Sequence, residues 1–407
     1  MTKKKNSKYS VDKPNPFIYA VLKIGSWFMA RIFYNFRIIK NDTKGVKGPY
    51  VVIQNHESQM DFYSSYYGIN RTAHAVISNS FYQVSKIRKY MKLSGTIPKQ
   101  QFQTSIGDLK IMKSALEQGR PLIFYPQGLM TEDGIATIVP KATGKALKWF
   151  RQDVYVANIS GTYLSNPKWS SIKRRGRPTL SITKLFSKEE LENLSQEEIE
   201  RIVEEKLYFD AYKNQEKNRI PYKNGDLIEG LHYPLYKCPK CEKEFSMKTE
   251  KNRIYCMNCG NKGYADKLGF LYPETKQDVI FKHPSDWSRF IQKHLEDDIK
   301  LVENYAIEST GILHILNYDS HQFEITGDCE IKLDNTGFTL TFTNQKEEII
   351  KHFDTTGIYL IPFASGKYFE LQDGLDIYRI YISNPEQISK WMNVHKTYYR
   401  IRNNLDL

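Results

Sequence analysis

The hydrophobic positions between residues 41 and 205 fall into short runs that alternate between strand-like and helix-like spacing. Apolar runs predict strands at 50–53, 122–125 and 154–159, and helical spacing predicts helices at 104–118 and 141–150. Such alternation is typical of α/β layer folds. We therefore expect one domain over residues 41–205, built as a mixed sheet with flanking helices.

The segment 16–39 has a wide apolar face beside a narrow polar one. With successive residues about 100° apart on a helix, Lys23, Arg31 and Arg37 fall within an arc of about 120°. A helix of this kind suits the plane of a membrane interface, although a helix packed on its own domain can show the same pattern. We expect residues 1–40 to form a basic tail followed by this helix.

The chain after residue 205 first loses its periodicity. Residues 206–235 are rich in Tyr, Lys and Asn and are interpreted as a connector. A cysteine-containing module follows at 236–264, and then a helical linker at 265–305 whose helix is predicted at 284–300.

Residues 306–407 have the pattern of a β-rich domain. Alternating or apolar runs predict strands at 323–325, 330–333, 338–342, 358–361 and 378–382. The tetrapeptide at 334–337, Asp-Asn-Thr-Gly, predicts a hairpin turn, and a helix is expected at 385–399. This order resembles a pleckstrin-homology-like region, a small barrel closed by a C-terminal helix, in topology alone.

Composition narrows the class of protein. The chain has 407 residues, of which 40% are hydrophobic, so two or three folded domains are expected and disorder is not. The formal net charge is +13, and the first fifty residues hold eleven Lys or Arg against two Asp. This bias suits anionic lipid, nucleic acid or an anionic small substrate, although Lys3 to Lys5 alone are interpreted as a solvated tail.

The chain shows no run of about eighteen uncharged apolar residues, so no transmembrane helix is expected. No signal-peptide cleavage pattern follows the basic start. We therefore expect a cytoplasmic protein that is peripheral on the inner face of a bacterial-type cell membrane.

His56 follows the predicted strand at 50–53, and Asp61 lies five residues later. Positions five apart on a helix differ by about 140°, so the pair can meet only if His56 sits on a turn and Asp61 in the first helical turn. Ser58 and Asp61 fit a capping box that would start this helix. The spacing alone favours a turn histidine beside a capping aspartate, and it recurs at His314 and Asp319.

Residues downstream of His56 change this balance, because several short blocks follow in order. The blocks are Asn55-His56 with Asp61, Ile77-Ser78 with Lys86, Gly95-Thr96-Ile97-Pro98, Leu122-Ile123-Phe124-Tyr125-Pro126-Gln127-Gly128, and Gly144-Lys145-Ala146. With the strand at 154–159, they make residues 17–205 resemble the 1-acylglycerol-3-phosphate (lysophosphatidate or lysophospholipid) acyltransferase family.

The resemblance implies an O-acyltransferase of phospholipid biosynthesis. His56 would act as general base on the free hydroxyl of lysophosphatidate or a related lysophospholipid, and Asp61 would orient it. The acyl donor would be an acyl-CoA or acyl carrier protein thioester. The substrate-binding positions implied are Asn55, Lys99, Gln127 and Gly128.

The blocks also depart from the family pattern. Gln127 stands where Glu is usual, Leu129-Met130 replaces Thr-Arg, and Gln101 stands where a basic residue is usual, which leaves Lys99 as the phosphate contact. The alternative is a catalytically weak or inactive member that acts as a membrane- or nucleic-acid-binding scaffold.

Four of the five cysteines form two Cys-x2-Cys pairs, namely Cys238, Cys241, Cys256 and Cys259. Two such pairs can complete the tetrahedral site of a structural zinc ion, with no open position for catalysis. The module resembles a zinc ribbon, and a reducing compartment is expected. It carries both signs of charge, which favours a structural spacer over a nucleic-acid-binding module.

Overall fold

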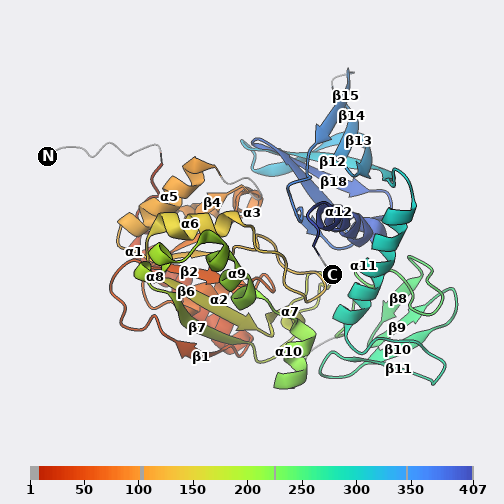
Figure 1. Ribbon diagram of the computed structural model, residues 1–407, viewed down its shortest axis with the longest axis horizontal. Helices are drawn as coiled ribbons and strands as arrows, with labels where there is room; N and C mark the ends of the chain where they lie inside the picture. Colours follow the sequence, from red (N-terminus) through yellow and green to blue (C-terminus); the bar gives the residue numbers. More distant parts are fainter. Residues whose placement is uncertain (1–8, 101–104, 224–225, 345–346, 406–407) are drawn as a thin grey trace. The chain divides into compact units, whose positions relative to one another are not determined.

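The computed structural model describes residues 9–100, 105–223, 226–344 and 347–405. The chain divides into two compact units (Figure 1). Unit 1 comprises Met1–Thr131, Ile135–Asn166 and Arg175–Asn214, and unit 2 comprises Glu132–Gly134, Pro167–Arg174 and Gln215–Leu407. The finer domain boundaries expected from the sequence stay a prediction, and the basic tail and Gln101 lie outside the described residues.

Unit 1 is built on a seven-stranded sheet in the order β1-β7-β6-β2-β5-β3-β4. Neighbouring strands run parallel except β6 and β7, which are antiparallel. The strands are β1 Arg37–Asn41, β2 Val51–Gln54, β3 His74–Ser78, β4 Ile97–Lys99, β5 Leu122–Phe124, β6 Val154–Ser160 and β7 Thr179–Phe186. The expected mixed α/β sheet is confirmed.

Helices cover both faces of this sheet (Figure 1). Val51 and Ile53 of β2 point into a core that contains side chains of α5, α6, α8 and α9, whereas Val52 points into a core on the opposite face. Burying each such side chain contributes about 1.5–3 kcal/mol. After the N-terminal helix, unit 1 contains α2 Asp61–Gly68, α3 Asn79–Val84, α4 Arg88–Leu93, α5 Ile106–Glu117, α6 Ala142–Phe150, α7 Thr162–Ser165, α8 Lys188–Asn193 and α9 Gln196–Leu207.

The N-terminal helix is shorter than the segment 16–39 that the sequence pattern predicts. It runs as α1 Pro16–Trp27, continues as a π-helix η1 Phe28–Phe33, and gives way to β1 at Arg37. Asn35 has a φ of 57°, and the Phe36 N–H donates to the Ala30 carbonyl, so the wider turn ends the helix before the buried Phe36.

The sequence predicts no membrane-spanning helix, because Lys23 and Arg31 interrupt the apolar run. In the described part of the chain, however, Pro16–Phe33 is long and apolar enough to cross a membrane by length and composition. The core helices of soluble proteins and signal sequences pass the same test.

Unit 2 begins with a small four-stranded sheet in the order β11-β10-β9-β8. Its strands are β8 Met247–Glu250, β9 Arg253–Cys256, β10 Lys262–Ala265 and β11 Leu271–Pro273. Helix α10 Ala211–Asn218, which lies in the predicted connector, precedes it, and α11 Pro284–Leu301 follows as predicted.

A second seven-stranded sheet fills the rest of unit 2, in the order β15-β14-β13-β12-β18-β17-β16. Its elements are β12 Ile307–Asn317, β13 Gln322–Asp334, β14 Gly337–Asn344, β15 Glu347–Phe353, β16 Phe363–Ala364, β17 Tyr368–Asp373, β18 Asp376–Ile382, the 3-10 turn η2 Pro385–Gln387 and α12 Ile388–Arg402. The predicted turn is confirmed, because Asp334 Oδ1 accepts from the Thr336 N–H and Gly337, with a φ of 130°, begins β14.

Three expectations for this sheet are wrong. No strand pairing closes the sheet among the described residues, because β15 and β16 are its two edges. The sheet that the structure describes is therefore open, and the expected closed barrel is not formed. The segment 358–361 forms no strand. The two strands predicted at 323–325 and 330–333 are the single strand β13, because the bulge opposite Leu313 and His314 lets pairing continue through Gly327.

Two short segments that precede residue 205 belong to unit 2. Glu132 is buried there, and its Oε1 accepts hydrogen bonds from the hydroxyls of Ser365, at 2.6 Å, and Ser389, at 2.7 Å. The Trp169 carbonyl lies so close to Gly230 that a Cβ there would overlap it. These contacts hold both segments among residues that come much later in the sequence.

Candidate active site

His56 lies just beyond the carboxyl end of β2, which is the middle one of three adjacent parallel strands. The neighbouring ends are those of β5, followed by Tyr125, and β6, followed by Thr162. The carboxyl edge of parallel strands is where α/β sheets place their ligand sites. Side chains from three loops therefore meet around His56.

The imidazole of His56 is paired with Asp61. Its Nδ1 lies 2.9 Å from Asp61 Oδ2, the Asp61 side chain is fully buried, and the His56 side chain is 19% exposed. A carboxylate at Nδ1 places the proton on that nitrogen and leaves the lone pair on Nε2. The ring is thus held in one orientation, and part of the His56 side chain is exposed.

The turn between the two residues wraps around the Asp61 carboxylate. Oδ2 accepts the backbone N–H of Glu57 at 2.7 Å and of Ser58 at 2.9 Å, and Oδ1 accepts the Thr162 hydroxyl at 2.8 Å. Helix α2 begins at Asp61, as the geometry of the pair required. The Ser58 capping box is wrong: Met60 is the N-cap, and Ser58 Oγ accepts the Met60 N–H.

His56 is also fixed from the side of β5. The Tyr125 ring lies 4.4 Å from the imidazole, centroid to centroid, and its hydroxyl donates to the Asp61 carbonyl at 3.0 Å. The Thr131 N–H donates to the His56 carbonyl at 3.4 Å. The imidazole therefore has little freedom to turn away from Asp61.

Gln127 supports the backbone of His56. Its Oε1 accepts the His56 N–H at 3.0 Å, and its Nε2 donates to the carbonyls of Thr137 at 3.1 Å and Leu207 at 3.4 Å. An amide can accept and donate at once, whereas a carboxylate can only accept. The Gln127 amide therefore matches its two carbonyl neighbours as well as the His56 N–H.

The other predicted substrate-binding residues lie in different surroundings. Asn55 exchanges two hydrogen bonds with the backbone of Ile159. Gly128 has a φ of 73° and donates its N–H to Tyr125, which forms a tight turn. Lys99 ends β4, which β5 and β3 separate from β2, and its Nζ donates to the Gln100 carbonyl at 3.0 Å. Burial lowers the pKa of Lys99.

Glu57 and Thr162 adjoin the His56–Asp61 pair, although no motif in the sequence points to them. Glu57 Oε2 accepts the N–H groups of Thr162 at 2.9 Å and Tyr163 at 3.0 Å, and it lies 3.0 Å from the Thr162 hydroxyl oxygen. Burial, followed by the charge of Asp61, raises the pKa of Glu57 to about 8. A Glu beside a polar turn is ordinarily exposed, so the sequence carries no signal for this burial.

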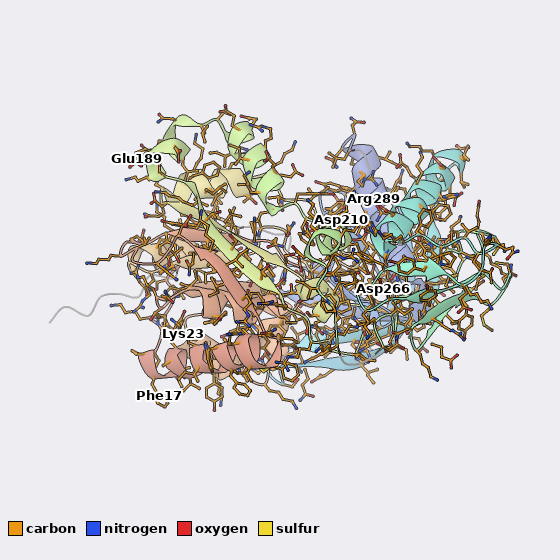
Figure 2. The ribbon with its side chains drawn as sticks, turned by 90° about the horizontal axis from the view of Figure 1, so that it is seen from below. Phe17, Lys23, Glu189, Asp210, Asp266 and Arg289 are labelled. Carbon is orange, nitrogen blue, oxygen red and sulfur yellow. The ribbon has the colours of Figure 1, made fainter. Side chains whose placement is uncertain are left out.

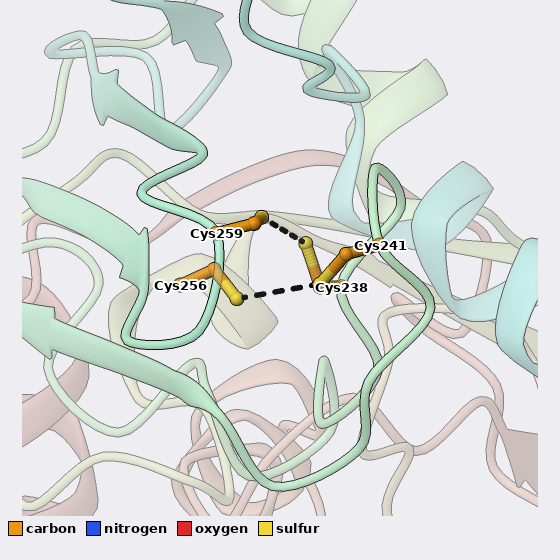
Figure 3. Close-up of side chains that lie close together, drawn as sticks. All are labelled: Cys238, Cys241, Cys256 and Cys259. Carbon is orange, nitrogen blue, oxygen red and sulfur yellow. Dashed lines mark hydrogen bonds between the residues drawn. The ribbon is translucent and has the colours of Figure 1, made fainter.

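The four predicted cysteine ligands come together in unit 2 (Figure 3). Their sulfurs lie within 4.8 Å of one another, with 3.7 Å from Cys238 to Cys259 and 3.8 Å from Cys241 to Cys256. Zinc–sulfur bonds of about 2.3 Å in a tetrahedron place sulfurs about 3.8 Å apart, whereas a disulfide needs about 2.05 Å. The cluster therefore fits a metal ion.

Amide side chains support this cluster. Asn261 Nδ2 lies 3.7 Å from Cys238 Sγ, and Asn258 Nδ2 lies 3.6 Å from Cys241 Sγ. Gly260, with a φ of 70°, donates its N–H to the Cys256 carbonyl and closes the second turn. Such donors stabilise thiolates around a cation.

Comparison with known proteins bears on unit 1. Residues 35–169 match the Acyltransferase family model. The matched acyltransferase region contains the His56 and Asp61 pair, Gln127 and Thr162, and it ends before the cysteine module. The mixed, mainly parallel sheet agrees with an acyltransferase fold.

One solved structure similar to this chain is the crystal structure of the 1-acyl-sn-glycerophosphate (LPA) acyltransferase, PlsC, from Thermotoga maritima. The sequences are 19% identical, the match covers 50% of this chain and 78% of that chain, and the TM-score is 0.40. A comparison with curated proteins finds no match.

Proposed function

We propose that the acyltransferase region moves a fatty acyl group from a CoA or acyl carrier protein thioester to the free hydroxyl of lysophosphatidate or a related lysophospholipid. The observation that carries this proposal is the 2.9 Å contact between His56 Nδ1 and a fully buried Asp61, with the imidazole partly exposed. The match of residues 35–169 to acyltransferases supports the reaction class.

In this mechanism His56 Nε2 takes the proton of the acceptor hydroxyl as its oxygen attacks the thioester carbonyl carbon. Asp61 stabilises the imidazolium that forms. The carbon–sulfur bond then breaks, and the proton passes from Nε2 to the departing thiolate. General base catalysis of this kind contributes about 10²–10⁴-fold.

Transfer of a labelled acyl chain tests the mechanism. We expect His56→Ala to lower the rate by about 10²–10⁴-fold. The matched control is His314→Ala, because His314 and Asp319 share the same spacing in unit 2 and should leave transfer unchanged. Equal rates for wild type and His56→Ala, or no transfer by the wild type with any lysolipid and thioester, would reject the proposal and favour the scaffold alternative.

We propose a structural zinc ion for the four-cysteine cluster. Cys238, Cys241, Cys256 and Cys259 would hold it, and it would tie the two turns together without taking part in acyl transfer. The sulfur–sulfur distances of 3.7 and 3.8 Å, with all four sulfurs within 4.8 Å of one another, support this assignment.

We propose that unit 1 binds the inner face of the cell membrane through α1 and η1. Most large apolar side chains of this helix are exposed, including Phe17, Val21, Ile24, Trp27, Phe28, Ile32 and Phe33. The same helix carries Lys23 (Figure 2) and Arg31. Apolar side chains beside cations suit an anionic bilayer surface.

The segment 79–100 supports the same surface. It contains no Asp or Glu, and four large apolar side chains on or beside α3 and α4 are exposed: Phe81, Ile87, Tyr90 and Leu93. Lys86, Lys89 and Lys92 are exposed between them. The Asn15 N–H, at the start of α1, donates to the Leu93 carbonyl, so this segment adjoins the N-terminal helix.

A further inference from the structure

Glu57 is a buried carboxyl group to which the proposed mechanism gives no role. The residue is 1% exposed. Its Oε2 accepts backbone N–H groups from Thr162 and Tyr163, whereas its Oε1 is buried without a hydrogen-bond partner among the described residues. Ionising the carboxyl group in such a place costs free energy, because one of its oxygens has lost its hydrogen bonds to water and has gained no protein donor among the described residues.

One hydroxyl lies between Glu57 and Asp61. Thr162 Oγ1 is 3.0 Å from Glu57 Oε2 and 2.8 Å from Asp61 Oδ1, and Thr162 is fully buried. A threonine hydroxyl has a single hydrogen. If both carboxyl groups were ionised, one of these contacts would bring two oxygens together with no hydrogen between them. The geometry is satisfied when the carboxyl pair holds one proton.

The surroundings decide which group holds that proton. Asp61 Oδ2 accepts two backbone N–H groups and contacts the imidazole of His56, so its charge is well compensated. Glu57 faces Asp61 across the hydroxyl. Burial and then the charge of Asp61 raise the pKa of Glu57 to about 8. The backbone N–H groups of Thr162 and Tyr163, together with the Thr162 hydroxyl, lower this pKa and only partly oppose the rise. Near neutral pH the proton therefore resides mainly on Glu57.

We propose that Glu57 is a positioning residue that donates to the Thr162 hydroxyl, which in turn donates to Asp61, so that a directed chain of hydrogen bonds holds the carboxylate against His56. The inference rests on the proposed function, because His56 is taken as the base. Loss of the Glu57 proton places a second negative charge beside Asp61. The single hydrogen of the Thr162 hydroxyl can then be donated to either carboxylate. The His56–Asp61 contact then loosens, and acyl transfer falls.

The pH dependence of acyl transfer tests the chain, with non-enzymatic thioester hydrolysis subtracted. We expect kcat/KM of the wild type to fall as pH rises through about 8. Glu57→Ala should lower the rate near neutral pH by about tenfold, and Glu57→Gln, which imitates the protonated group, should restore it and remove the alkaline fall. Thr162→Val should behave like Glu57→Ala, and Thr162→Ser should behave like wild type. An unchanged alkaline fall in Glu57→Gln would overturn the proposal.

A second measurement needs no turnover. The infrared carbonyl band of a protonated carboxyl group should be present in the wild type at pH 6, should disappear as pH passes about 8, and should be absent from Glu57→Gln. His56→Ala should lower transfer by about 10²–10⁴-fold and keep the band. A wild type that shows the band but no transfer would reject the acyltransferase function alone. Transfer without such a band would reject the positioning role of Glu57.

Thermal unfolding supplies a third test, because the proposal fixes the direction in which Tm changes with pH. The folded chain keeps the Glu57 proton up to about pH 8, whereas an unfolded glutamate releases it near its ordinary value of 4.5. Rising pH between these values therefore destabilises the wild type. The Tm of Glu57→Gln relative to wild type should increase steadily from pH 5 to pH 8. A Tm difference that does not change with pH would contradict the assignment.

Discussion

Asn55 and Ile159 exchange two hydrogen bonds, so that the side-chain amide of Asn55 pairs with the backbone of β6 as another strand would. Nδ2 donates to the Ile159 carbonyl at 2.9 Å, and Oδ1 accepts the Ile159 N–H at 2.7 Å. Because Asn55 immediately precedes His56, this pair fixes the level at which β2 ends. Asn55 is thus a support of the active-site turn.

Replacing Asn55 with Ala should destabilise unit 1. Two buried backbone groups of Ile159 would lose their partners, at a cost of about 1–3 kcal/mol each if water does not replace the amide. Urea unfolding gives the change in free energy of unfolding. Asn193→Ala is the matched control, because Asn193 is exposed on α8 and should change stability by less than about 0.5 kcal/mol. Equal effects of the two substitutions would contradict this role.

Gln127→Glu should impair the protein, although it introduces the residue of the block that this segment resembles. The carboxylate would face the carbonyls of Thr137 and Leu207 without a hydrogen to donate, which costs about 1–3 kcal/mol. We expect a lower midpoint of urea unfolding and lower acyl transfer. Gln322→Glu, at an exposed strand end, is the control. A gain in activity without loss of stability would show that the Gln127 contacts are unimportant.

One zinc ion per chain is expected from elemental analysis of the purified protein. Cys256→Ser should lose the metal, because three thiolates and a hydroxyl hold zinc much less tightly. Cys329→Ala should keep it, since Cys329 lies in β13 and outside the cluster. A zinc content that is the same in both variants, or absent from the wild type, would reject the metal site.

Vesicle binding should depend on the apolar side of α1 and η1. We expect the double substitution Ile24→Asp and Phe28→Asp to weaken binding to vesicles rich in anionic lipid by at least about tenfold, because two apolar side chains are replaced by anions. Leu301→Asp is the control, since Leu301 is 82% exposed on α11 in unit 2. Sedimentation with vesicles measures the difference, and equal binding by both variants would exclude this surface.

The sequence predicts the core elements of unit 1 well where proline, glycine or capping residues mark their ends. Gly119 and Pro121 precede the start of β5, and Ser105 caps α5. These elements begin within about two residues of their expected positions. The His56–Asp61 contact follows from the spacing and the order of blocks, and the four cysteines follow from their own spacing.

The elements that the sequence misplaces depend on distant partners. Residues 37–39 look like the end of an amphipathic helix, yet pairing with β7 makes them a strand. Residues 358–361 have the composition of a strand, but no neighbouring strand pairs with them in the described sheet. Glu57 escapes notice for the same reason, because its burial comes from Thr162 and Tyr163, more than a hundred residues away.

The hydrogen bonds of Glu132 bear on how this protein can be dissected. A chain shortened to residues 1–205 keeps every block that resembles an acyltransferase, but it removes Ser365 and Ser389, the hydroxyl donors to a buried carboxyl group. Glu132 follows Thr131, whose N–H donates to the His56 carbonyl, so the lost hydroxyl contacts adjoin the loop that reaches His56. Truncation at residue 205 therefore removes contacts next to the loop whose Thr131 reaches His56.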